Sequence, residues 1–218
     1  GAGISQESGI STFRDANGLW NNHKIEEVAS PEGFEKNPQL VLDFYNARRR
    51  QLDEVKPNEA HHLIAQLETK YNVTIITQNI DDLHERAGST NVLHLHGELR
   101  KCRSSKNPNL IYDCNQDIKL GDLASDGNQL RPHIVWFGEE VTEIEKAIAI
   151  TQSADLFVIV GTSMVVHPAA SLLLAVPVDV QTVYIDNNPD VEEGINLLVI
   201  KEKATAGVRI LVEECLPY

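Results

Sequence analysis

The sequence predicts an α/β fold in which a doubly wound parallel sheet carries a smaller inserted lobe. Three observations predict it: short β-branched runs that are apolar on both faces, helical patterns that alternate with these runs, and two long stretches that interrupt the alternation. The chain of 218 residues, 42% of them hydrophobic, is long enough to bury one core of this kind with an insertion.

Four β-branched runs end in polar or glycine-rich turns, which is typical of interior strands of a parallel sheet. They cover residues 73–77, 91–95, 156–160 and 181–185. Helical patterns cover residues 38–54, 58–70, 142–153 and 167–175. Strands and helices that alternate in this way indicate a Rossmann-like sheet domain.

Two stretches do not fit the alternation. Residues 18–70 are mostly helical and contain no strand run, and residues 97–131 are polar, turn-rich and irregular. We expect these two stretches to form the small lobe, and residues 1–17, 71–96 and 132–218 to form the sheet domain. A cleft between two lobes is a common place for a ligand.

The charge balance narrows the range of partners. The formal net charge is −13, which leaves no basic surface to follow a phosphate backbone, so we expect no binding to nucleic acid. An acidic surface suits basic, lysine-bearing partners. No apolar run approaches the ~18 residues that cross a bilayer, so we also expect no membrane contact.

The cysteines point to a reducing compartment. Cys102, Cys114 and Cys215 are a sparse and odd set, which argues against a disulfide framework. Because no secretory leader pattern is present, we expect a cytoplasmic protein, and we expect it to be a monomer. The chain opens directly on a glycine turn, so we expect a native strand ahead of Gly1.

The opening segment has the character of a phosphate-binding turn. Gly1, Ala2 and Gly3 allow backbone N–H groups to approach a pyrophosphate, and Ser5 is placed to start a helix whose N-terminus favours anions. The usual dinucleotide fingerprint has its third glycine where this chain has Gln6. Taken alone, the segment predicts only a glycine-rich turn.

Further motifs follow this turn in a fixed order. Residues 7–15 read Glu-Ser-Gly-Ile-Ser-Thr-Phe-Arg-Asp, residues 77–81 Thr-Gln-Asn-Ile-Asp, residues 94–98 His-Leu-His-Gly-Glu, residues 135–139 Val-Trp-Phe-Gly-Glu and residues 161–163 Gly-Thr-Ser. In this order they resemble the sirtuin family, from Gly1 to about Asn188 and more weakly near Ala204. The helix segment Phe-Tyr-Asn-Ala-Arg-Arg-Arg at residues 44–50 is similar to that of the bacterial class III type.

The resemblance implies an NAD-dependent protein-lysine deacylase. In this family the acyl-lysine oxygen attacks the ribose C1′ of NAD, and the products are nicotinamide, free lysine and 2′-O-acyl-ADP-ribose. The reaction needs a base for a ribose hydroxyl, and a histidine with a near-neutral pKa is suited to this role. The resemblance assigns the base to His96, because the base of the family directly precedes a glycine, as His96 precedes Gly97.

Without the resemblance, His94 is also a candidate for the base. His94 lies two residues before His96, on the same face of a strand that persists this far. A His-x-His pair at a strand end is also typical of a structural or metal-binding pair. Only the resemblance decides between the two histidines.

The resemblance also implies which residues bind NAD. Asn79 and Asp81 would hold the nicotinamide ribose and carboxamide, and with His96 they form the catalytic set; as Asn and Asp they also suit the start of a helix, and both roles are compatible. Arg14 and Phe13 would cover the cofactor, unless they are simply exposed in a free loop. Trp20 would pack this loop. The full cofactor set is Gly1, Ala2, Gly3, Ser5, Ser8, Gly9, Phe13, Arg14, Trp20, Gln78, Asn79, Ile80, Asp81, Gly161, Thr162, Ser163, Asp186, Asn187, Asn188 and Ala204.

Two further segments are expected to bind the substrate. An extended peptide would add as a third strand between residues 135–139 and residues 164–167. The expected peptide contacts are Val135, Trp136, Phe137, Gly138, Glu139, Val165 and Val166. Tyr45 and Arg48 lie three residues apart on one helical face, and in the resemblance they match the pair that binds the carboxylate of succinyl and malonyl groups. The alternative is a solvated basic helix face, since Arg48 to Arg50 run together.

One family feature is missing. Most sirtuins carry two CxxC pairs that bind zinc in the small lobe, whereas this chain has only Cys102 and Cys114 there and no histidine among residues 98–132. We therefore expect no metal. The small lobe should then be held by packing of Leu110, Ile111, Tyr112, Ile118, Leu120 and Leu123.

Other functions remain as alternatives. A mono-ADP-ribosyltransferase would use the same fold, but the intact peptide segments together with His96 favour deacylation. An NAD-sensing binding module would need no base, so the presence of His96, Asn79 and Asp81 together argues against it. A dehydrogenase is disfavoured by Gln6 and by the lack of an acidic ribose-binding residue about twenty positions after the glycine turn.

Overall fold

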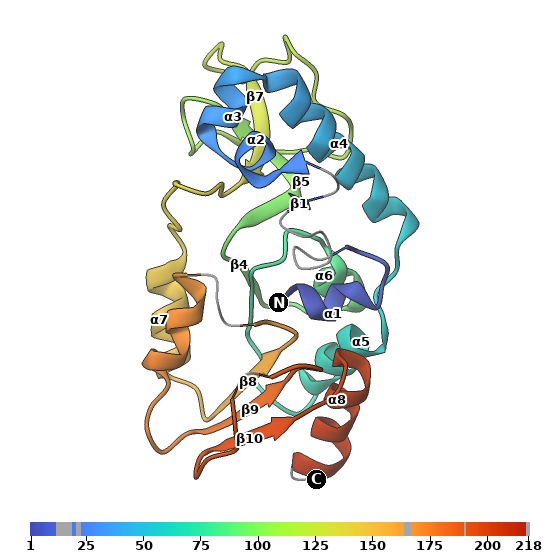
Figure 1. Cartoon of the computed structure of the whole chain (residues 1–218), viewed down its shortest axis with the longest axis vertical. Helices are drawn as coiled ribbons and strands as arrows, with labels where there is room; N and C mark the ends of the chain where they lie inside the picture. Colours follow the sequence, from blue (N-terminus) through green and yellow to red (C-terminus); the bar gives the residue numbers. More distant parts are fainter. Residues whose placement is uncertain (12–18, 21–22, 164–166, 190, 217–218) are drawn as a thin grey trace.

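The computed structural model describes residues 1–11, 19–20, 23–163, 167–189 and 191–216 (Figure 1). Within this part of the chain, no helix is both long enough and apolar enough to cross a membrane. The sheet domain and the small lobe lie at opposite ends of the long axis of the molecule, and α1 (Ala2–Gln6) lies between them.

All four expected strands are present, although the first two are shorter than expected. β3 (Ile75–Thr77) pairs in parallel with β4 (Val92–His94), and β8 (Leu156–Val160) pairs in parallel with β9 (Gln181–Ile185). The sequence analysis missed β10 (Leu197–Ile200), which extends the second sheet in the order β10-β9-β8. The parallel strands that are described therefore form two sheets.

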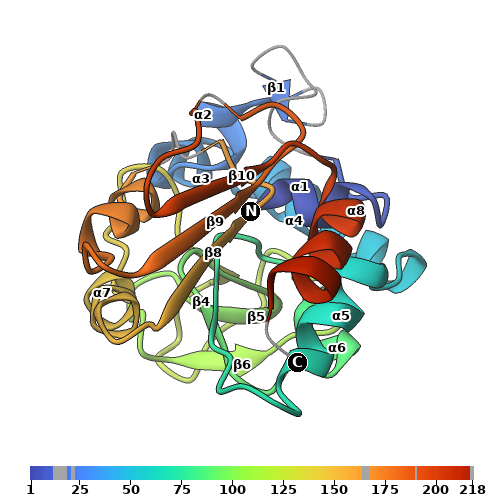
Figure 2. The same cartoon turned by 90° about the horizontal axis from the view of Figure 1, so that it is seen from below.

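Helices cover both faces of the β8–β10 sheet, as a doubly wound fold requires. Figure 2 shows α7 (Ile144–Gln152) on one side of these strands, and α5 (Glu59–Leu67), α6 (Leu83–Ala87) and α8 (Ala204–Ile210) on the other. The helix expected at residues 167–175 is a 3₁₀ helix, η2 (Ala169–Ala175), and a π-helical turn, η3 (Leu211–Cys215), follows α8.

Two core clusters account for this layering. One joins Val183, Ile185 and Ile200 of the sheet to Ala60 of α5 and to Val208 of α8. The other places Ala147 of α7 and Leu172 of η2 against Leu93 and Leu95. Both faces of these strands are covered by helices. Side chains on both faces are therefore apolar, and the strands are continuous apolar runs in the sequence.

The small lobe is built around one long helix. α4 (Pro38–Glu54) begins at Asn37, whose side chain accepts a hydrogen bond from Leu40 N, and Pro38 occupies the first turn, where its missing N–H costs nothing. Two shorter helices, α2 (Ile25–Val28) and α3 (Pro31–Lys36), precede it. The stretch 18–70 also contains two short strands, β1 (Leu19–Trp20) and β2 (His23–Lys24), which the sequence analysis did not predict.

The stretch 97–131 is turn-rich, as expected, but it also contains strands that the sequence analysis did not predict. It forms most of an antiparallel sheet of β5 (Gly97–Ser104), β6 (Ile111–Asp113) and β7 (Leu130–Ile134), in the order β6-β5-β7. The strands were missed because charged side chains alternate with buried ones along β5, where Leu99 and Cys102 are buried.

The packing expected for this lobe is confirmed only in part. Ile118 is buried with Leu42 and Cys102, and Tyr112 packs against this cluster. Ile111, Leu120 and Leu123 are exposed instead. Hydrogen bonds also connect α4 to this segment. The Asn46 side chain donates to Ile118 O over 2.8 Å and accepts from Ile118 N over 2.9 Å.

Candidate active site

The glycine turn lies directly against the carboxyl end of β8. Gly3 N donates to Gly161 O over 2.8 Å, and a Cβ on Gly3 would lie 2.8 Å from the Gly161 Cα. Gly161 has a φ of +59°, a conformation that L side chains rarely adopt. Both positions therefore need glycine, because the turn and the end of β8 are in direct backbone contact.

A buried polar cluster joins this turn to the loop after β3. Ser5 Oγ donates to Asp81 Oδ2 over 2.8 Å and accepts from Asn79 Nδ2 over 3.0 Å. Asn79 Nδ2 also donates to Gly1 O over 3.1 Å. The structure thus brings together three residues that the sequence analysis assigned to the cofactor or to catalysis.

Asp81 has two roles in this cluster. Its Oδ1 accepts a hydrogen bond from Leu83 N at the start of α6, so it also supports the helix end, as the alternative interpretation held. Burial raises the pKa of Asp81, and the hydrogen bonds from Ser5 and Leu83 oppose this rise. Its charge is therefore sensitive to the neighbours that face it.

Other residues that the sequence analysis assigned to the cofactor lie around this cluster. Thr162 Oγ1 donates to Gln78 Oε1 over 3.3 Å, and Thr162 O accepts from the Tyr184 hydroxyl over 2.7 Å. Ser8 Oγ accepts from Asn58 Nδ2 over 2.9 Å. Asn58, which also donates to Ile4 O over 2.7 Å, supports the turn and was not identified from the sequence, although its place at the start of α5 was a possible signal.

The residues assigned to the adenosine end lie on the next strand. Asp186 follows β9, is buried, and accepts a hydrogen bond from Asn188 N over 2.8 Å, while Asn187 and Asn188 are exposed. Ala204 is buried at the start of α8 in the core. It can therefore offer a ligand its backbone more readily than its side chain.

His96 lies between Gln78, which follows β3, and the loop of residues 135–139. Its ring hydrogen-bonds the Gln78 backbone, and its carbonyl accepts from Val135 N over 2.9 Å. Burial lowers the pKa of His96, and the Gln78 contact opposes this only in part. His94 is held elsewhere, by the Asn79 carbonyl and the Glu85 carboxylate.

The loop of residues 135–139 presents only some of its residues to the surface. Phe137 and Gly138 are exposed, and Phe137 N donates to Ala29 O over 3.0 Å. Trp136 is buried under the loop. This arrangement leaves Phe137 and Gly138 as the accessible part of the motif.

Glu139 is turned inward. Its carboxylate accepts from Arg131 Nη1 at 2.6 Å, from Arg103 Nη2 at 3.1 Å and from Trp136 N at 2.8 Å. The Arg131 guanidinium also lies over the Trp136 ring, 3.2 Å from its centroid. Glu139 therefore shapes the loop, and its side chain is engaged with the protein itself.

Tyr45 and Arg48 are both buried, at 0% and 5% exposure, so the solvated-face interpretation does not hold for Arg48. Trp136 Nε1 donates to the Tyr45 hydroxyl over 3.0 Å. A cavity of about 20 Å³ is lined by Arg48, Ile80 and Asp81, among others. Burial lowers the pKa of Arg48 to about 10, so the guanidinium stays charged at neutral pH, near the carboxylate of Asp81.

Several assigned residues lie outside the described part of the chain. These are Phe13, Arg14, Val165 and Val166. Trp20 belongs to β1, where its backbone pairs with His23.

The small lobe shows how the two cysteines are placed. Cys102 of β5 pairs across the sheet with Tyr112, and its side chain hydrogen-bonds that of Cys114, which follows β6. Over the ranges that the structure describes, no group of three or more His, Cys, Asp and Glu side chains is arranged to hold a metal ion.

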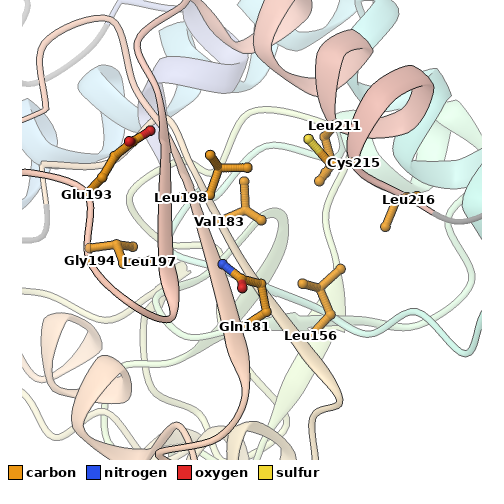
Figure 3. Close-up of a pocket in the computed structure, with 10 residues that line it drawn as sticks. All are labelled: Leu156, Gln181, Val183, Glu193, Gly194, Leu197, Leu198, Leu211, Cys215 and Leu216. Atoms are coloured by element: carbon orange, nitrogen blue, oxygen red, sulfur yellow. The ribbon is translucent and has the colours of Figure 1, made fainter.

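One cavity lies at the other end of the β8 and β9 strands. It measures about 450 Å³ and is lined by Leu156 and Gln181, the first residues of β8 and β9, and by Leu211 and Cys215 from the C-terminal helical segment (Figure 3). The polar cluster lies at the opposite, carboxyl end of these strands. In α/β folds the ligand binds at the carboxyl ends of the parallel strands. The polar cluster is therefore the candidate active site, and this cavity is not.

These features are a glycine turn against a strand end, a buried Ser-Asn-Asp cluster and a histidine beside an exposed loop. On a parallel α/β sheet they define a Rossmann-like protein of the nucleotide-binding class. The Sir2 family model matches residues 1–168. The chain belongs to the Sir2 family.

Similar proteins agree with this assignment. An NAD-dependent protein deacylase of Bacteroides thetaiotaomicron is 53% identical over 224 residues, covering 100% of this chain and 96% of that protein. One of Helicobacter pylori is 62% identical over 186 residues, covering 85% and 81%. A crystal structure of a Sir2 homologue in complex with NAD superposes with a TM-score of 0.86 at 39% identity, covering 97% of this chain and 85% of that one.

Proposed function

We propose that this protein removes acyl groups from protein lysine side chains in an NAD-dependent reaction with His96 as the general base. The position of His96 carries the proposal. Its ring contacts the Gln78 backbone on the nucleotide side, and its carbonyl accepts from Val135 N on the peptide side. The base therefore lies where a ribose and an acyl-lysine would meet.

The protonation state of His96 suits a base. Because burial lowers its pKa, the imidazole is neutral at pH 7 and one ring nitrogen keeps its lone pair. The Gln78 backbone takes up the N–H of the other nitrogen and so fixes the tautomer. His96 can then accept the proton of a ribose hydroxyl.

The residues around the glycine turn fit NAD. A side chain on Gly3 or Gly161 would collide with the backbone of the other, so these glycines let the turn lie directly against the end of β8. A glycine-rich turn at the end of a strand is where dinucleotide-binding folds hold a pyrophosphate. When bound, NAD would supply an electrophilic ribose carbon and a nicotinamide leaving group. The buried cluster of Ser5, Asn79 and Asp81 would orient the ribose and the carboxamide, and Asp186 with its neighbours would hold the adenosine ribose.

The acyl-lysine would enter along the exposed part of the 135–139 loop as an extended strand. Backbone pairing accepts many sequences, which favours broad selection among lysine sites. Val165 and Val166 are proposed as the second edge from the family resemblance.

Acyl selectivity is proposed to come from α4. Arg48 is buried, charged and beside Asp81, and Tyr45 lies one turn away on the same helix. Burial raises the pKa of Tyr45 well above its usual value, so the phenol stays neutral and can donate a hydrogen bond. A neutral donor and a guanidinium suit the carboxylate of succinyl and malonyl groups, in addition to acetyl groups.

Further properties are proposed from the cysteines and the charge balance. Two thiol groups are too few for a structural zinc site, so the enzyme works without zinc. The sparse cysteines favour the cytoplasm. We also propose a monomer that acts on acyl-lysine proteins or peptides, without nucleic acid or membrane partners.

The test is direct. The protein is incubated with NAD and peptides that carry acetyl-, propionyl- or succinyl-lysine, and mass spectrometry follows nicotinamide, free lysine and acyl-ADP-ribose. We expect the three products in equal amounts. ADP-ribose attached to a protein would indicate the mono-ADP-ribosyltransferase instead, and NAD binding without nicotinamide release would indicate a binding module.

A further inference from the structure

The His94 ring has a hydrogen-bond acceptor at each of its nitrogens. Nδ1 lies 2.9 Å from the Asn79 carbonyl oxygen, and Nε2 lies 2.7 Å from a carboxylate oxygen of Glu85 on α6. A carbonyl oxygen and an ionised carboxylate accept hydrogen bonds and donate none. Both contacts are hydrogen bonds only when both ring nitrogens carry protons, so the geometry requires an imidazolium.

We propose that His94 is a positively charged positioning residue that links the Asn79 carbonyl to the Glu85 carboxylate and so holds the loop of residues 78–81 in its binding conformation. The loop joins β3 to α6 and carries the Asn79 and Asp81 side chains of the buried cluster. The proposal rests on the proposed function in one respect, that this loop binds NAD. The charge of His94 itself can be measured without NAD.

The charges around His94 support this assignment. Burial acts to lower the pKa of His94, but the hydrogen bond and charge of Glu85, the Asn79 carbonyl and the charge of Glu98 outweigh it, and the pKa is raised. Glu98 of β5 is itself paired with Lys101 at 2.7 Å, so Glu85 is the main counter-ion.

Two other titratable groups face His94. Burial raises the pKa of Asp81, and the charge of His94 is among the influences that oppose this rise, so the imidazolium helps to keep the buried carboxylate ionised. His84 on α6 is buried, and burial lowers its pKa to about 3, so it adds no competing charge near pH 7.

The His-x-His pair is therefore divided between two roles. His96 is half-buried with a lowered pKa, whereas the pKa of His94 is raised and each of its ring nitrogens faces an acceptor. The neutral ring is the base, and the charged ring holds the loop that the base faces. The sequence alone could not separate the two, because the acceptors of His94 lie on other segments.

Nuclear magnetic resonance of ¹⁵N-histidine in the full chain, without NAD, tests the charge. The His94→Gln and His96→Gln variants assign the signals. At pH 7 we expect two protonated nitrogens for His94 and one for His96, and we expect Glu85→Gln to lower the His94 midpoint by about one pH unit or more. Glu98→Gln is the matched control, and we expect a smaller shift because Glu98 acts on His94 through its charge alone, whereas Glu85 also accepts a hydrogen bond. A neutral His94 at pH 7, or equal shifts from both variants, would overturn the proposal.

Kinetics test the positioning. We expect His94→Leu to raise the KM for NAD by about three- to tenfold and to change kcat less, because one charge-assisted hydrogen bond to the loop is lost. His94→Gln keeps an amide donor for the Asn79 carbonyl and should recover part of this loss. An unchanged KM in His94→Leu would refute the positioning role. If the unmodified protein proves inactive, the proposed function fails, and the resonance result still decides the charge of His94.

Discussion

Trp136 Nε1 donates a hydrogen bond to the Tyr45 hydroxyl over 3.0 Å, between two side chains that are almost completely buried. This contact joins the loop proposed to bind peptide to the helix proposed to bind the acyl group. The phenol accepts from the indole, and its own proton remains on the oxygen because burial raises the pKa of Tyr45. The two proposed halves of the substrate site are thus in direct contact.

The first prediction concerns the acyl carboxylate. Arg48→Met should lower desuccinylation by roughly ten- to a hundredfold and spare deacetylation, because a charge-assisted pair contributes ~1.5–3 kcal/mol. Arg50→Met is the control, since Arg50 lies two residues along the same helix but is exposed. Rates on matched acetyl and succinyl peptides measure the effect. If both activities fell equally, or neither fell, Arg48 would not be an acyl ligand.

The second prediction concerns the base. His96→Ala should lower turnover by roughly two to four orders of magnitude, the usual contribution of a positioned base, and leave NAD affinity largely intact. Calorimetric titration with NAD and single-turnover assays measure the two quantities separately. A fully active His96 variant beside a dead His94 variant would show that the base had been assigned to the wrong histidine.

The third prediction concerns metal. Purified protein should contain no stoichiometric zinc, and a chelator should leave its melting temperature unchanged, because Cys102 and Cys114 supply only two thiolates. Elemental analysis and thermal unfolding with and without chelator provide the measurements. About one zinc per chain would contradict it.

The fourth prediction concerns acid stability. His61 and His84 are buried with their ring centroids 4.9 Å apart, and burial lowers their pKa values to about 4 and about 3. A histidine with a lowered folded-state pKa binds more protons when unfolded. Its contribution is therefore complete above the unfolded pKa of about 6.5 and is lost as the pH falls toward 4.

Urea unfolding measures this dependence. The free energy of unfolding should fall between pH 7 and pH 5, and a His61→Gln, His84→Gln double variant should show a flatter dependence over the same range. His62→Gln serves as the control, because His62 is exposed on the same helix as His61. An equally steep decline in the double variant would mean that other groups cause it.

The sequence predicted the elements whose signals are local. α4 has the predicted bounds because Asn37 and Pro38 mark its start within a few residues of chain. β10 carries an apolar run, Leu197 to Ile200, of the same kind as the other strands and could have been identified. β5 could not have been identified from the sequence. Charged residues alternate with its buried ones, and the buried positions are set by pairing with β6 and β7.

The site divides in the same way. Motif resemblance was sufficient to select Ser5, Asn79 and Asp81, which the structure brings together. It did not predict that Glu139 turns inward, because the partners Arg131 and Arg103 lie on β7 and β5. The orientation of a side chain depends on partners that are distant in sequence, and single motifs do not contain that information.

α4 is held at its middle and at its C-terminal end by different parts of the molecule. Asn46 holds Ile118 in the small lobe, whereas Arg86 of α6 donates to Leu52 O and Val55 O at the C-terminal end. Tyr45 and Arg48 flank Asn46 on this helix. Any hinge motion of the small lobe would therefore tilt the acyl-recognising pair relative to the ribose. Substitutions in α4 would change which acyl chain is accepted and leave the glycine turn and the Ser5-Asn79-Asp81 cluster unchanged. Acyl specificity and NAD binding can therefore evolve separately.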